Sequence, residues 1–146
     1  MNAISSKFAD WVVQRITHAI PAEWRESVPV YNERELNFDQ HIQQSVNKGL
    51  GACFAVSLPR ISKEGDNSPG NTQYRLQLEV GLTHNAGLSP ALNSQELAEV
   101  VFRAFVGAEY YSGGILAYDV AADNLTGTST GVSQTHVFSV YFILTL

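Results

Sequence analysis

Histidine, serine and acidic side chains are the residues of this 146-residue chain whose types suit acid–base or nucleophilic chemistry. His84 is the best placed, because it lies at the end of an alternating segment, where a base could serve a cleft together with Asp119. No Gly-x-Ser-x-Gly elbow is present, and a Ser, a His and an Asp occur in almost any chain of this length. Solvated or capping roles are therefore favoured, and the sequence names no catalytic residue.

Metal and cofactor sites are not predicted either. The four histidines are far apart in the chain, and none has a cysteine or carboxylate at the spacing of metal ligands. Residues 127–131 and 49–51 contain glycines, but neither segment lies between a strand and a helix as a phosphate-binding loop does. Cys53 stands in an apolar segment without an intrachain partner, which favours a buried, inert thiol over a nucleophile.

The composition is that of a globular protein, with 45% hydrophobic and 16% charged residues. A chain of this length can form one domain over residues 1–146. No apolar run approaches the roughly 20 residues needed to cross a bilayer, and the first residues lack the apolar core of a signal peptide, which predicts a cytoplasmic protein. The net charge of −5, without a cluster of Lys or Arg, argues against tight binding of nucleic acid.

The expected fold is organised around residues 74–85, where apolar and polar side chains alternate as in a strand with one buried face. Residues 94–106 then repeat apolar side chains at helical spacing. Asn93 and Glu96 have the spacing of a capping box, and Gly107 is placed to end the helix. Because such a helix can cover the apolar face of the strand, an α+β fold is predicted.

Further elements complete this arrangement. Residues 5–19 form an apolar stripe typical of a helix, which Pro21 ends. Residues 37–48 read either as a short helix capped by Asn37 or as an irregular loop. A short strand is expected at 28–31, where Pro29 marks either a sheet edge or the beginning of the strand. Further strands are expected at 52–58 in the interior, at 115–120 and at 134–146, with exposed connections over 62–72, 108–114 and 123–133. The predicted class is an α+β domain in which an antiparallel or mixed sheet of about four or five strands packs against two main helices.

The last expected strand carries apolar side chains on both faces, since Val137, Tyr141 and Ile143 alternate with Phe138 and Phe142. A strand of this kind lies in the centre of a sheet or meets a partner chain on its second face. The candidate contacts with an oligomer or partner are Tyr110, Tyr111, Val137, Tyr141 and Ile143.

This order of elements resembles that of tailed-bacteriophage tail terminators, also called tail completion or tail-to-head joining proteins. The resemblance covers nearly the whole chain. It is carried by the helix ending at Ala19, the short strand at Val28, the strand pair at Ala52 and Tyr74, the helix over 94–106 and the closing strands at Ile115 and Gln134. The family offers no short motif, so no interface residue is carried over by position, and residues 37–48 depart from its pattern.

The resemblance implies a structural protein with no enzymatic activity and no cofactor. Such a protein forms a ring, commonly of about six copies, that caps the tail tube, fixes its length and gives the DNA-filled head an attachment surface. The implied partners are further copies of the chain, the tail tube protein and the head–tail connector protein. DNA would pass nearby without specific binding, and no membrane is involved. The implied location is the host bacterial cytoplasm during assembly and the virion tail afterwards.

Two other classes remain open. Another structural protein of a phage neck or contractile injection system would also assemble as a ring. A small dimeric α+β enzyme or ligand-binding domain also fits the length of the chain. A pocket lined by His84 and Asp119 would favour the enzyme, whereas a flat or ring-like self-contact would favour the tail protein.

Overall fold

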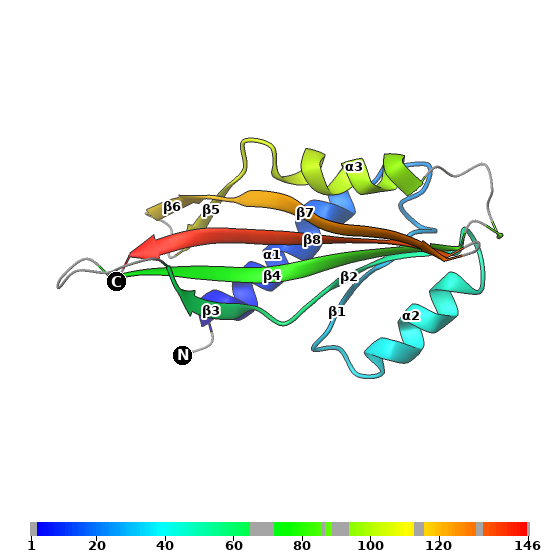
Figure 1. Ribbon diagram of the computed structural model, residues 1–146, viewed down its shortest axis with the longest axis horizontal. Coiled ribbons are helices and arrows are strands. Elements are labelled where there is room, and N and C mark those ends of the chain that lie inside the picture. Colours follow the sequence, from blue (N-terminus) through cyan, green and yellow to red (C-terminus); the bar gives the residue numbers. More distant parts are fainter. Residues whose placement is uncertain are drawn as a thin grey trace.

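The computed structural model describes residues 3–64, 72–85, 87–88, 94–112, 116–130 and 133–145. Within these ranges the chain forms three helices, a six-stranded mixed sheet and a two-stranded sheet, which confirms the α+β class (Figure 1). The helices are α1 (Ala3–Ala19), α2 (Phe38–Val46) and α3 (Ser94–Phe105). The strands are β1 (Val30–Asn32), β2 (Ala52–Val56), β3 (Arg60–Lys63), β4 (Gln73–Asn85), β5 (Glu109–Ser112), β6 (Leu116–Asp119), β7 (Ala121–Thr130) and β8 (Ser133–Thr145).

The long strand β4 is the centre of the main sheet, whose order is β1-β2-β4-β8-β7 with β3 also paired to β4. β4 and β8 pair antiparallel from Gln73 opposite Thr145 to Asn85 opposite Ser133. β2 is antiparallel to β4, as expected for two long strands joined by a polar connection. β1 joins β2 in parallel and forms an edge, so the sheet is mixed and the edge alternative for the first strand is confirmed.

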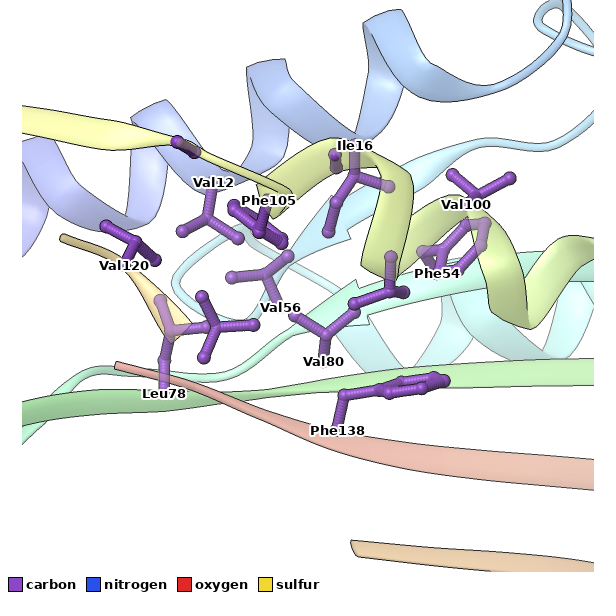
Figure 2. Close-up of a cluster of buried hydrophobic side chains, with 14 of the residues drawn as sticks. Val12, Ile16, Phe54, Val56, Leu78, Val80, Val100, Phe105, Val120 and Phe138 are labelled. Atoms are coloured by element: carbon purple, nitrogen blue, oxygen red, sulfur yellow. The ribbon is translucent and has the colours of Figure 1, made fainter. Parts of the chain in front are cut away.

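One face of the sheet is covered by α1 and α3. The alternation predicted for β4 is observed, because Leu76, Leu78, Val80 and Leu82 are all fully buried on this face. Figure 2 shows side chains of α1 and α3 directed toward those of β2 and β4. Since burying one large apolar side chain contributes about 1.5–3 kcal/mol, this layer is the main source of stability.

The third helix, α2, lies on the opposite face of the sheet from α3 (Figure 1). Tyr31 pairs with Ala55 and so projects away from the α1–α3 layer, and its hydroxyl oxygen lies 2.7 Å from that of Ser45 in α2. The Asn85 side-chain amide donates to the Val46 carbonyl of α2 over 3.0 Å. Cys53 is buried on this face, and burial raises the pKa of its thiol to about 11, in keeping with the expected inert cysteine.

Two expected connections are strands instead. β5 occupies part of 108–114 and pairs with β6, and the ten-residue β7 occupies most of 123–133 and forms the second edge of the main sheet. The prediction of a flexible connection over 123–133 was wrong, because it gave more weight to the glycines than to the alternating threonines. Thr126, Thr128 and Thr130 recur at every second residue, and β-branched side chains favour strands. A bulge between Asn124 and Thr126 absorbs one residue in the pairing with β8.

Helix ends and short elements differ in detail from the expectation. The helix alternative for residues 37–48 is confirmed by α2, but Asn37 adopts a left-handed conformation with φ 60° and makes no side-chain capping bond. β3 occupies the beginning of the expected connection over 62–72. Gly107, with φ 64°, ends α3 as predicted, whereas Asn93 lies outside the described residues.

Candidate assembly surface

The second face of β8 is the candidate contact surface. Val137, Tyr141 and Ile143 are partly exposed on this face, while Phe138 and Phe142 are buried on the other. Of the described helices, α1 and α3 lie on the buried side, and the main contacts of α2 with the sheet are to β1, β2 and β4. We call this surface the open sheet face; its side chains include Arg75, Gln77, Glu79, Val137, Tyr141 and Ile143.

Charged groups on the open sheet face are held in place by neighbouring side chains. The Arg75 guanidinium carbon lies 4.2 Å from the centroid of the Tyr141 ring. The same guanidinium donates to both carboxylate oxygens of Glu64, over 3.0 and 3.1 Å. This double contact fixes a planar cation over the aromatic ring. The result is an ordered, half-apolar surface, which suits contact with another protein better than chemistry on a small molecule.

The two adjacent tyrosines of β5 have different environments. Tyr110 is 5% exposed, and its ring centroid lies 5.2 Å from Phe8, 5.2 Å from Trp11 and 5.4 Å from Phe142. Burial, and then the nearby Asp10 carboxylate, raises the pKa of the Tyr110 hydroxyl. Tyr111 is 59% exposed, because successive residues of a strand face opposite sides. Tyr110 is therefore a core residue and not the predicted contact, whereas Tyr111 is available for one.

The sheet register separates His84 from Asp119. His84 is 1% exposed and pairs with Gln134 of β8. Ala121, two residues after Asp119, pairs with Tyr141, seven positions along β8 from Gln134. At about 3.4 Å per residue these two positions are roughly 24 Å apart. The backbone therefore does not bring the candidate base and acid to one cleft, and no group of three metal-ligating side chains occurs among the described residues.

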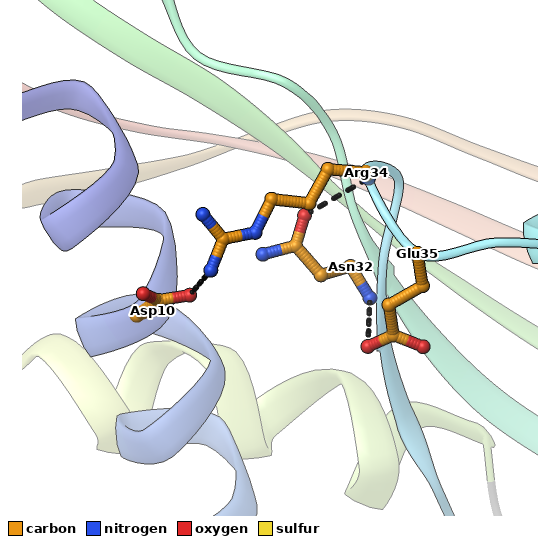
Figure 3. Close-up of polar contacts among 4 residues, drawn as sticks. All are labelled: Asp10, Asn32, Arg34 and Glu35. Carbon is orange, nitrogen blue, oxygen red and sulfur yellow. Dashed lines mark hydrogen bonds and ion pairs between the residues drawn. The ribbon is translucent and has the colours of Figure 1, made fainter. Parts of the chain in front are cut away.

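A polar cluster that the sequence did not reveal joins α1 to the loop after β1 (Figure 3). Asn32 is 4% exposed, and its side-chain oxygen accepts from the Arg34 backbone N–H over 3.2 Å. The Asn32 backbone N–H donates to Glu35 over 3.1 Å, and the Arg34 guanidinium forms an ion pair with Asp10. Asp10 is 24 residues from Arg34 in the chain, so local spacing carries no signal of this contact. The cluster positions the β1 edge against α1.

None of the helices in the described part of the chain is long and apolar enough to span a membrane. No family model matches the sequence, and no curated protein matches it at a significant level. The resemblance to tail terminators therefore stays a prediction.

Proposed function

We propose that this protein is a subunit of a phage tail terminator. Copies of the chain would form a ring, commonly of about six, that caps the tail tube and presents the attachment surface for the head connector. The order of elements supports this proposal: an N-terminal helix, an edge strand, an antiparallel strand pair, a covering helix and closing strands.

The observation that carries the proposal is the open sheet face. Val137, Tyr141 and Ile143 project from a central strand toward a side that no described helix of the same chain covers. Contact with another protein would remove this apolar area from water and contribute roughly 25 cal/mol per Å². A subunit that functions only within an assembly is expected to carry such a face. In this proposal the open sheet face binds the tail tube protein.

The charge of the chain supports the same function. The terminator lumen must let DNA pass without retaining it, and a protein that neutralises many phosphates would bind DNA tightly. The net charge of −5 avoids such retention. A negative net charge suits a passage for DNA better than a surface that binds nucleic acid.

The first test measures absolute mass by light scattering over a range of concentrations, with negative-stain images of any large species. The proposal predicts a closed ring of about six copies, alone or after addition of the tail tube protein of the same phage. A compact dimer that does not bind tube protein would contradict the proposal and favour the enzyme or ligand-binding alternative.

The role of the open sheet face is tested by Tyr141→Glu. This substitution should weaken binding to tube protein by at least about tenfold, because the contact loses the apolar ring and must desolvate a carboxylate in its place. Gln40→Glu adds the same charge at an exposed position of α2 and is the matched control. Equal tube binding by both variants and the wild type would remove the open sheet face from the proposal.

A further inference from the structure

Two short strands on different sides of the molecule each have one edge without a neighbouring strand among the described residues. β3 pairs only with β4, on the side where β2 also lies, and β5 pairs only with β6. Figure 1 shows β3 below the long strands and β5 above them. Because the free edge of a strand presents backbone donors and acceptors, each can accept a strand from another chain.

The side chains of the two strands are complementary. On β3, Ile61 and Lys63 share one face, and Ile61 is 55% exposed. On β5, Glu109 and Tyr111 share one face, and Tyr111 is 59% exposed. Neither Lys63 nor Glu109 belongs to an ion pair among the described residues. Each strand thus offers one apolar and one charged side chain two residues apart, and the two charges are opposite.

We propose that β3 of one copy pairs antiparallel with β5 of the next copy, with Lys63 opposite Glu109 and Ile61 opposite Tyr111. Opposite charges and pairs of aromatic with β-branched side chains are the combinations that stabilise antiparallel strands. This inference rests on the proposed function and names the contact between copies of the ring. It leaves the open sheet face for the tube protein.

Pairing between two copies of β3 is less favourable. Two copies of β3 in antiparallel register would set Arg60 of one chain opposite Lys63 of the other, and like charges directly opposite are destabilising. The contact between β3 and β5 joins two different surfaces, and each copy carries both a β3 edge and a β5 edge. Such a head-to-tail contact repeats from copy to copy until it closes a ring or extends as a filament.

The contact is tested by exchanging its charges. Lys63→Glu and Glu109→Lys should each weaken self-association by about tenfold or more, because attraction across the strands becomes repulsion. The double variant Lys63→Glu with Glu109→Lys should associate like the wild type. Lys7→Glu makes the same charge change at an exposed position of α1 and should have no effect.

A mixture of the two single variants gives the sharpest result. β3 of the Lys63→Glu chain can pair with β5 of the Glu109→Lys chain, and the reverse contact sets Lys63 opposite Glu109 as in the wild type. Only a contact between two chains of the same variant sets like charges opposite each other. Sedimentation should therefore show assemblies of wild-type size in which the two variants alternate, although neither variant associates alone. In wild-type background, Lys63→Cys and Glu109→Cys chains should form a mixed disulfide, while Ser62→Cys and Glu109→Cys chains, one residue out of register, should not.

The outcomes separate this inference from the proposed function. Unchanged self-association of Lys63→Glu, or a double variant no better than the single ones, would overturn the β3–β5 contact, and a ring that persists would leave the terminator proposal standing. Filaments or mixed assemblies that obey the charge exchange, without a closed ring or tube binding, would support the contact and contradict the terminator. A chain that stays monomeric at every concentration and with tube protein would overturn both.

Discussion

At the scale of single residues, several side chains act on parts of the chain remote in sequence. Arg15 of α1 donates from Nε and Nη2 to the carbonyl oxygen of Ala104, over 2.9 and 2.6 Å. This carbonyl lies in the last turn of α3, where backbone acceptors lack helical partners and a positive charge is favourable. Arg15 therefore adds a polar link between two helices that also pack through apolar side chains.

Leu78→Asp tests the apolar layer at one position. Leu78 is fully buried on the face covered by α1 and α3, so an aspartate there would carry an unpaired charge into the core. We expect a loss of about 4 kcal/mol or more in the free energy of unfolding, measured by urea titration followed by circular dichroism. Gln77→Asp, on the neighbouring open sheet face, should cost less than about 1 kcal/mol. Equal stabilities would mean that the two faces of β4 are assigned backwards.

At the scale of elements, the sequence predicts the helices and strands whose pattern of apolar residues is long and unbroken. The 13-residue β4 and the helix α3 were both predicted, because alternation and helical periodicity extend over many residues. The two apolar faces of β8 predicted either a central place in the sheet or a partner chain, and the central place is confirmed by its position between β4 and β7. Sequence also places Tyr141 on the face opposite to Phe142, which is the arrangement that defines the candidate surface.

Strands whose conformation depends on pairing with a neighbouring strand were predicted poorly. β7 contains glycine, serine and asparagine, and its strand conformation is maintained by pairing with β8. β3 and β5 are four residues long and likewise need β4 and β6 as partners. A short polar strand carries little signal because pairing, and not propensity, selects its conformation. The proposed β3–β5 contact between copies could not be predicted from the sequence, because both strands are short and carry little signal.

Two glycines test the local backbone requirement of these elements. Gly107 and Gly81 both have open space where a Cβ atom would be added, but Gly107 has φ +64° and Gly81 has no left-handed conformation. Gly107→Ala should therefore cost about 1 kcal/mol in the free energy of unfolding, as a left-handed alanine does. Gly81→Ala should be neutral or slightly stabilising, because it restricts the unfolded chain. Thermal unfolding of both variants measures the difference, and equal losses would contradict a backbone origin.

At the scale of the whole molecule, the candidate contacts differ in character. The open sheet face is partly apolar, and its Arg75 is already paired with Glu64 within the chain. In the proposed contact, the β3 and β5 edges combine backbone groups with the charges of Lys63 and Glu109, which would pair between copies. Copy-to-copy assembly and attachment to the tube are thus expected to respond differently to solution conditions.

Ionic strength is the variable that separates these contacts. Self-association through β3 and β5 should weaken as salt rises from about 0.05 M to about 0.5 M, because screening shortens the range of the Lys63–Glu109 attraction. Sedimentation velocity across this range measures the effect. The variant Lys63→Gln with Glu109→Gln keeps both edges but removes both charges, so its association should depend little on salt. Wild-type association that strengthens with salt, and that Tyr141→Glu abolishes, would instead assign the contact between copies to the open sheet face.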